Sequence, residues 1–156
     1  MLVYIIDGFN LIHKVSKLRN SNFPQKALID YIYLNRFTGS KNNKVIIVFD
    51  GYMPAGLKRQ EAGFEVLFGG DVSADELIKS KVSGIKQKSE VIVVSDDRQI
   101  KDFITAKGAR SFGISDFMKK KTKQKTNEAE KDIDYSLQYE ITQELRKSLL
   151  KKYEGE

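Results

Sequence analysis

The chain has 156 residues, of which 40% are hydrophobic and 31% charged, values that are typical of one globular domain and exclude a disordered chain. It has no cysteine and one histidine, which excludes a disulfide framework, a thiolate zinc site and a cysteine nucleophile and fits a reducing cytoplasm. The formal net charge of +6 suits nucleic acid, an acidic partner or simple solubility, so charge alone does not choose between them.

Short apolar runs alternate with helical patterns along the first part of the chain. The first run, residues 2–6, is too short for a signal peptide or a bilayer span and predicts a buried strand in a soluble, intracellular protein. Similar patterns predict strands at 45–49, 64–68, 91–95 and 110–113, and helices at 24–37, 74–85 and 97–107. This alternation predicts right-handed crossovers, and therefore an α/β fold with a mostly parallel sheet.

The helix predicted at 74–85 carries an acid near its inner side. Ser73 and Glu76 have the spacing of a capping box, with Ser73 just before the first helical residue. On a helical projection Asp75 falls at the edge of the apolar arc, beside Ile78 and Val82, whereas Glu76 points away. A carboxylate held against the core is costly unless something pairs with it, so Asp75 is a candidate functional residue.

The composition changes after Phe117. Residues 118–126 hold five lysines and no acid, which predicts a solvated connector. Residues 132–153 have an apolar residue at every fourth position, which predicts a helix that crosses the domain diagonally. We therefore expect residues 1–117 to form the α/β domain and residues 118–156 to pack on it.

Aspartates follow the predicted strands. Asp7 follows the first strand, Asp50 the second, and Asp96 and Asp97 the fourth, while Asp75 opens the helix after the third. Each of these alone has an ordinary interpretation as a turn residue or a helix cap, and Asp96 is a candidate cap for the helix that follows it. Because parallel strands end at the same edge of a sheet, we expect all five to lie along one edge, where such sheets bind ligands.

Electrostatics predicts what such a cluster does. Two carboxylates about 4 Å apart repel by roughly 4 kcal/mol at an effective dielectric near 20, so several together must take up protons or bind a cation. Oxygen ligands favour Mg²⁺ or Mn²⁺, with Ca²⁺ also compatible. Such an ion can activate a water and stabilise charge on a phosphoryl group, while basic side chains hold a polyanion. The pattern therefore predicts metal-dependent chemistry on a phosphate group of a polyanionic substrate.

The same residues resemble the NYN domain ribonucleases of the YacP-like group. The resemblance covers about residues 1–117 and rests on segments in the family's order: Asp7-Gly-Phe-Asn10, Phe49-Asp50-Gly51, Ser73-Ala-Asp75-Glu-Leu-Ile78, and Val94-Ser-Asp-Asp-Arg98 with Gly108-Ala109. It implies a three-layer PIN-like fold with helices on both faces of the sheet. It also implies metal-dependent endoribonuclease activity, which in some members is associated with translating ribosomes.

Carried over by position, the resemblance implies three metal-binding acids: Asp7, Asp75 and Asp97. It implies that Asn10 orients Asp7 or a bound water, and that Asp50 is a ligand or lies beside one. Asp96 and Asp97 are both candidates, because helical geometry does not separate them; the family pattern ranks Asp97 first.

Several basic side chains are candidate contacts for RNA phosphates, and of these Arg98 directly follows the acids: Arg98, Lys58, Arg59, Lys119, Lys120 and Lys121. Arg98 could equally pair with Asp97, and most lysine runs are only solvated. His13 is interpreted as a half-exposed helix residue rather than a member of the site, and Phe9 as a core aromatic rather than a surface for bases.

Two other functions fit parts of the pattern. A non-catalytic RNA-binding module with the same fold would bind RNA with a steep salt dependence and would not cleave it. A phosphotransfer protein also gathers aspartates at strand ends, but a receiver domain needs paired acids after its first strand, and here Gly8 follows Asp7. The prediction is therefore an endoribonuclease, with no membrane partner and with its oligomeric state left open.

Overall fold

The computed structural model describes residues 1–61 and 63–125. The chain has two compact units, Met1–Lys119 and Lys120–Glu156, and the fold below is that of the first. Every helix within the described residues is too short or too polar to traverse a lipid bilayer. The helix predicted over 132–153 lies outside the described residues.

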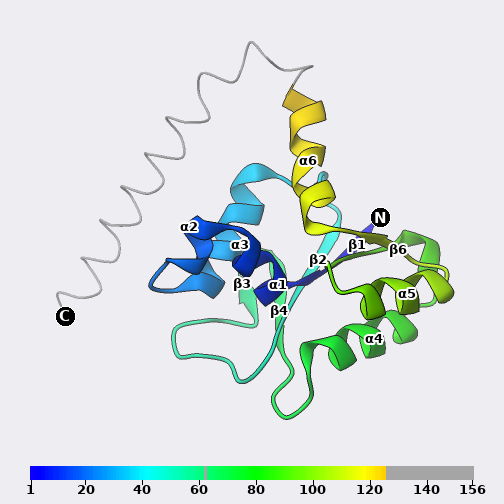
Figure 1. Cartoon of the computed structure of the whole chain (residues 1–156), viewed down its shortest axis with the longest axis horizontal. Helices are drawn as coiled ribbons and strands as arrows, with labels where there is room; N and C mark the ends of the chain where they lie inside the picture. Colours follow the sequence, from blue (N-terminus) through cyan, green and yellow to red (C-terminus); the bar gives the residue numbers. More distant parts are fainter. Residues whose placement is uncertain (62, 126–156) are drawn as a thin grey trace. The chain divides into compact units, whose positions relative to one another are not determined.

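Within the described part of the chain, six strands form one sheet (Figure 1). Their order across it is β3 (Gln60–Glu61), β4 (Phe64–Phe68), β2 (Lys44–Phe49), β1 (Val3–Asp7), β5 (Val91–Val94) and β6 (Arg110–Phe112). All neighbours are parallel except β3, which runs antiparallel to β4 at the edge. The predicted mostly parallel sheet is confirmed, and β1 lies between β2 and β5.

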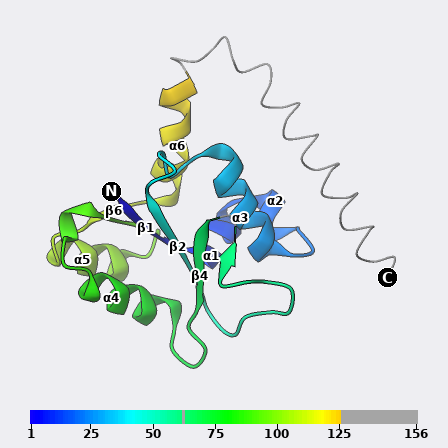
Figure 2. The ribbon, with the colours of Figure 1, turned by 180° about the vertical axis from the view of Figure 1, so that it is seen from behind.

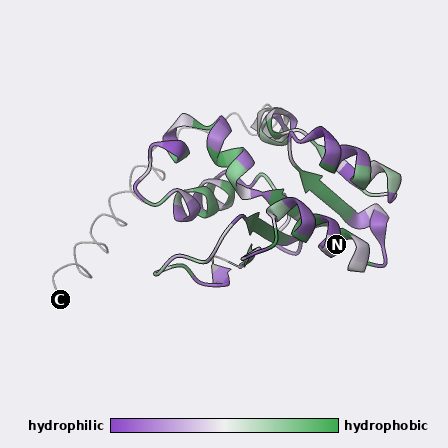
Figure 3. Ribbon diagram, turned by 60° about the horizontal axis from the view of Figure 1, so that its bottom comes forward, coloured by the Kyte–Doolittle hydropathy of each residue, from purple (hydrophilic) through white to green (hydrophobic). Residues whose placement is uncertain are grey.

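Helices cover both faces of the sheet, because successive side chains of a strand point to opposite faces. Tyr4 and Ile6 of β1 share one buried cluster with α1 (Gly8–Lys14), α2 (Ser16–Arg19), α3 (Pro24–Asn35) and the start of α6 (Ile114–Lys125). Val3 and Ile5 share the other with α4 (Ala74–Gly84) and α5 (Arg98–Ala106). Figure 2 shows these two groups of helices on opposite sides of the sheet, and Figure 3 shows the strands as the most hydrophobic elements. The three-layer α/β fold is confirmed.

The predicted helices and strands begin and end within two residues of those observed. The helix predicted to reach residue 37 ends at Asn35, because Arg36 adopts a left-handed conformation with φ of 51°. The short elements α2 and β3 were not predicted, and of α1 the sequence indicated only that His13 lies in a helix. Gly8 and Asn10 are weak helix formers that directly follow a strand, and α1 forms because its Leu11 and Ile12 are buried against the sheet.

The lysine-rich segment after Phe117, predicted to be a solvated connector, is helical up to Lys125, because α6 extends through it. Its start is fixed by Ile114 and Phe117, which are fully buried. Lysine has a high helix propensity, so the lysines prolong a helix that the core has already started.

Candidate active site

The acids predicted to share one edge of the sheet follow neighbouring strands there. Residues at the ends of the three central strands are in register, with Asp7 beside Val48 and Ile6 beside Val94. Asp50 follows β2, and Asp96 and Asp97 follow β5. At the end of β4, Phe68 is in register with Phe49, and the chain then turns into α4, which carries Asp75. The parallel register explains why acids from distant parts of the sequence meet.

Asp7 is the most buried of these acids, with 7% of its surface exposed. Burial, together with the negative charges of Asp75 and Asp50, raises its pKa to about 6, although hydrogen bonds from the backbone N–H of Asn10 and the hydroxyl of Ser95 lower it. The next residue is glycine because a Cβ at Gly8 would lie 2.3 Å from the ring of Phe49. Asp7 is thus held beside other negative charges in a place that disfavours its own charge.

Asp75 lies in the first turn of α4 and is half-buried. Burial raises its pKa, as do the charges of Asp97 and Asp50, while Lys79 acts in the opposite direction. The N-cap that the sequence predicts is confirmed, since the hydroxyl of Ser73 accepts a hydrogen bond of 3.2 Å from the N–H of Glu76. The cap fixes where α4 begins and hence where Asp75 points.

Asp50 is exposed and connects two of the elements that carry acids. Its Oδ1 accepts a hydrogen bond of 2.8 Å from the backbone N–H of Ala74, the first residue of α4. The end of β2 is thereby tied to the start of the helix that carries Asp75. Asp50 has both the structural role of a cap and a place next to Asp7 and Asp75, on which its charge acts.

Ser95 connects two of the acids and was not singled out in the sequence. Its side chain is fully buried, and its hydroxyl lies 3.4 Å from Oδ2 of Asp7 and accepts a hydrogen bond of 3.1 Å from the N–H of Asp97. The available signal was a lone polar residue at the end of an apolar strand. Buried hydroxyls normally have a partner, and the nearest candidates were these two aspartates.

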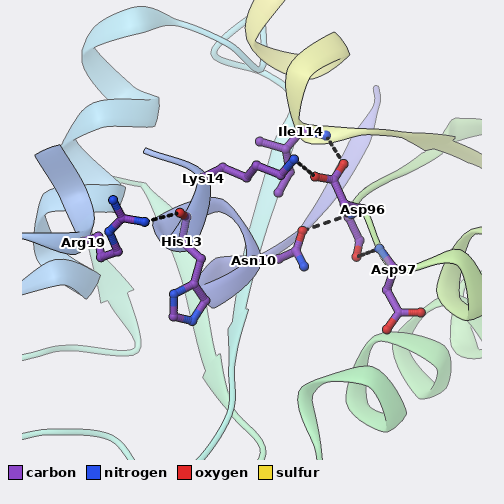
Figure 4. A network of polar contacts seen from close by, with 8 residues as sticks. Asn10, His13, Lys14, Arg19, Asp96, Asp97 and Ile114 are labelled. Atoms are coloured by element: carbon purple, nitrogen blue, oxygen red, sulfur yellow. Dashed lines mark hydrogen bonds and ion pairs between the residues drawn. The ribbon is translucent and has the colours of Figure 1, made fainter. Parts of the chain in front are cut away.

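Asp97 caps α5, since its Oδ1 accepts hydrogen bonds from the N–H groups of Gln99 at 2.8 Å and Ile100 at 3.3 Å. The expectation that Asp96 caps this helix is therefore wrong. Figure 4 shows the Asp97 carboxylate pointing away from Asp96 and Lys14. Its charge acts on Asp75 instead, so Asp97 shares the electrostatic field of the other acids.

Asp96 lies on the other side, in a network that links three elements (Figure 4). Its carboxylate accepts a hydrogen bond of 2.9 Å from the N–H of Ile114 at the start of α6 and lies 3.1 Å from Nζ of Lys14. Burial raises its pKa, but the Ile114 hydrogen bond, Lys14 and Lys101 together outweigh burial and lower the pKa of Asp96 below its usual value. The negative charge of Asp96 is thus compensated by groups of the protein itself. Lys14, its partner on α1, was not identified from the sequence.

Asn10 joins this network through its side chain. The amide oxygen of Asn10 accepts a hydrogen bond of 3.0 Å from the N–H of Asp96, which ties α1 to the loop after β5. Asp7 is contacted by the backbone of Asn10. The predicted role of Asn10 in orienting Asp7 or a bound water stays a prediction, and the observed contact positions the loop that carries Asp97.

The candidate RNA-binding residues lie on several elements. Arg98, at the start of α5, is exposed, as are Lys58 and Arg59 before β3 and Lys119 in α6. Lys120 and Lys121 also lie in α6. These roles stay predictions.

Two aromatic residues of α1 behave differently from each other. Phe9 packs against the core with its ring 5.3 Å from that of Phe49, as the sequence predicted. His13 is exposed rather than half-exposed, and its backbone oxygen accepts a hydrogen bond of 3.3 Å from Arg19.

The donor chemistry of the edge suits Mg²⁺ or Mn²⁺, because the converging side chains are carboxylates. Within residues 1–61 and 63–125, no three aspartate, glutamate or histidine side chains form a ready-made ligand set for one ion. Mg²⁺ usually keeps several waters and binds one or two carboxylates together with substrate phosphates. The acids Asp7, Asp75 and Asp97 fit that mode of binding, and the metal itself stays a prediction.

Comparison with known proteins gives a family and a fold. The family model described as YacP-like NYN domain matches residues 4–155, which extends beyond the segments that carried the resemblance. A crystal structure of Rae1 (YacP) from Bacillus subtilis is 22% identical, with a TM-score of 0.64 over 99% of this chain and 93% of that one. Its W164L mutant is 19% identical, with a TM-score of 0.57 over 88% and 89%. No curated protein sequence matches.

Proposed function

The chain belongs to the YacP-like NYN domain family, and we propose that it is a metal-dependent endoribonuclease whose site consists of Asp7, Asp75 and Asp97. Family membership implies a nuclease with an RNA-related function. The observation that carries the finer proposal is electrostatic. The pKa values of Asp7 and Asp75 are raised by burial and by other carboxylates, which means that their charged forms are disfavoured. A bound cation would stabilise the charged carboxylates.

Each acid has a distinct part in the proposal. Asp7, buried at the end of β1, is the central ligand, and Asp75 and Asp97 approach from α4 and from the start of α5. Asp50 holds the start of α4 in place through Ala74 and adds negative charge. A bound Mg²⁺ or Mn²⁺ would supply an activated water and neutralise charge at the scissile phosphate.

Asp96 is not a ligand in this proposal, although it was a candidate in the sequence. Its carboxylate already accepts a hydrogen bond from the Ile114 N–H and pairs with Lys14, so a metal would compete with both contacts. Its role is to hold α1, α6 and the loop after β5 together, which positions Asp97 next to it.

The test is cleavage of mixed RNA by the purified chain with Mn²⁺, with Mg²⁺ and with EDTA. The proposal expects cleavage that requires the metal and is lost in Asp75→Asn. The matched control is Glu76→Gln, because Glu76 is the exposed next residue of the same helix and its N–H, not its side chain, makes the capping bond. Cleavage that persists in EDTA, or in Asp75→Asn as in the control, would contradict the proposal.

One observation favours a second candidate, a non-catalytic RNA-binding module. Within the described residues, no three acidic or histidine side chains already form a ligand set. This candidate expects RNA binding that weakens steeply with salt and no cleavage at any Mn²⁺ concentration. The cleavage experiment therefore separates the two candidates directly.

As the setting of the reaction we propose mRNA on the ribosome, which the net charge of +6 supports through attraction to ribosomal RNA. The measurement is co-sedimentation of the purified chain with ribosomes at low and high salt. Binding at low salt that high salt releases is expected. A chain that stays in the supernatant at both would contradict the setting and leave the nuclease proposal intact.

A further inference from the structure

Two loops beside the acids expose apolar side chains that the fold does not require. Tyr52 is 71% exposed and Met53 42% in the loop after β2, and Val72 is 45% exposed in the loop after β4. These loops also carry Asp50 and lead into Asp75. Large apolar groups exposed next to a site commonly mark a surface that binds something.

The two loops are joined to each other. The N–H of Gly70 donates a hydrogen bond of 2.8 Å to the carbonyl of Gly51, which forms an isolated antiparallel bridge, and the N–H of Gly69 donates one of 3.1 Å to Phe49. Gly51 and Gly70 have φ of 81° and 65°, a conformation that favours glycine. The bridge gives the side chain of Tyr52 a fixed backbone beneath it.

Two contacts hold the hydroxyl end of the Tyr52 ring. A Cβ on Gly70 would lie 3.5 Å from Cε1 of Tyr52, so the ring lies against the bare backbone of this glycine. At the same end the Tyr52 hydroxyl donates a hydrogen bond to a carboxylate oxygen of Asp71. This bond raises the pKa of Tyr52, so the phenol stays protonated and neutral. The ring of Tyr52 is thus exposed to solvent and also held in one position by its contacts with Gly70 and Asp71.

Resting on the proposed function, we propose that Tyr52 is a stacking platform for an unpaired base of the RNA strand whose scissile phosphate lies at the proposed metal site. Aromatic faces stack on bases of any sequence, and a ring that is already fixed loses little conformational freedom on binding. The charges of Asp50, Asp71 and Asp75 repel an acidic group at this point, so a neutral base face suits it better than a phosphate. Lys58 and Arg59, exposed farther along the same connection, suit the backbone of such a strand.

The experiment measures binding of a fluorescent oligouridylate in EDTA, where cleavage cannot interfere, by anisotropy. Tyr52→Ala should raise the Kd about tenfold, whereas Tyr52→Phe, which keeps the ring, should raise it about twofold at most. Tyr33→Ala is the matched control. Tyr33 is 51% exposed, but its ring is 6.3 Å from that of Phe64, the first residue of β4, at the opposite end of the strands from the acids. The Kd of Tyr33→Ala for the oligouridylate should equal that of the wild type.

A second probe separates stacking from a general loss of binding. On an oligomer of the same length that lacks bases, wild type and Tyr52→Ala should bind equally, because the ring has nothing to stack on. Equal loss on both probes, or an unchanged Kd in Tyr52→Ala, would overturn the platform and assign the exposed ring to a protein contact instead. Thermal unfolding of each variant verifies that it is folded.

Failure of this inference and failure of the proposed function give different results. A wild type that cleaves RNA in Mn²⁺, with Kd and KM unchanged in Tyr52→Ala, contradicts only the platform. The opposite result is a wild type that never cleaves RNA, together with a Tyr52→Ala variant whose Kd rises about tenfold on the base-containing probe alone. That result supports the platform and contradicts the nuclease.

Discussion

The acidic edge has two sides that hold their carboxylates differently. Toward α6, Asp96 accepts a hydrogen bond from Ile114 and pairs with Lys14, and its pKa is lowered. Toward α4, Asp7 and Asp75 face burial and other carboxylates, and their pKa values are raised. A carboxylate whose charge is compensated by groups of the protein stabilises the fold, whereas carboxylates that repel one another favour binding of a cation. Consecutive aspartates can therefore have different functions.

The largest effect should separate these consecutive aspartates. Asp97→Asn should lower the rate of Mn²⁺-dependent RNA cleavage at least about a hundredfold, because it removes a proposed ligand, whereas Asp96→Asn should lower it no more than about tenfold. Asparagine caps helices about as well as aspartate, so both variants should fold. Initial rates on one RNA substrate measure the difference. Equal losses in the two variants would break the comparison between the two sides.

Stability should depend on pH in opposite directions on the two sides. The folded pKa of Asp7 is about 6 against an ordinary 3.8, so this residue should lower the free energy of unfolding as pH rises from about 4 to 7, by about 2 to 3 kcal/mol in the absence of metal. Below that range Asp7 is protonated in both states and the penalty vanishes. Asp96, whose folded pKa is lowered, stabilises the fold above pH 3.8 and loses this contribution at lower pH.

Urea unfolding in EDTA across this pH range measures the Asp7 contribution. The difference in the free energy of unfolding between Asp7→Asn and the wild type should grow in favour of the variant from pH 4 to 7. A difference that stays constant across the range would show that Asp7 is not under electrostatic strain.

A smaller effect should follow from removing the Asp96 network. Asp96→Ala should lower the free energy of unfolding at pH 7 by about 1 to 2 kcal/mol, since it leaves the Ile114 N–H without its acceptor. Glu76→Ala, which removes an exposed acid from α4, is the control and should change it by no more than about 0.5 kcal/mol. Equal values for the two would mean that Asp96 does not support the fold.

The smallest effect should come from the lysine of that network. Lys14→Met should cost only about 0.5 kcal/mol, because the side chain of Lys14 is 52% exposed and water screens its ion pair with Asp96. The loss should shrink further at high salt, as measured by thermal unfolding at two salt concentrations. A cost as large as that of Asp96→Ala would mean that the ion pair, not the hydrogen bond to Ile114, carries the network.

The sequence predicted the sheet and the position of the acids for a simple reason. Buried strands are readable from apolar runs, and parallel strands must bring their ends, and therefore Asp7, Asp50 and Asp97, to one edge. The different roles of Asp96 and Asp97 could not be predicted from the apolar runs and the parallel strands. They depend on Lys14 and Ile114, which reach Asp96 only through packing of α1 and α6.

The missed elements have a common cause. The helix α1 forms through burial of Leu11 and Ile12 despite weak local propensity, and α6 continues through lysines after Phe117 has fixed its start. Burial of apolar residues thus started both helices, against the local propensity in α1 and with the helix propensity of lysine continuing α6. Ser95 escaped notice for a related reason, since a hydroxyl at a strand end gains its meaning only from the carboxylates that surround it.

The most direct test of the central claim is Mn²⁺ binding at pH 7 by isothermal titration calorimetry. The wild type and Asp96→Asn should bind Mn²⁺ with similar affinity, whereas Asp7→Asn and Asp75→Asn should each bind at least about a hundredfold more weakly. Equal binding by Asp75→Asn and the wild type, or a loss confined to Asp96→Asn, would contradict the assignment of the repelling acids as the metal site.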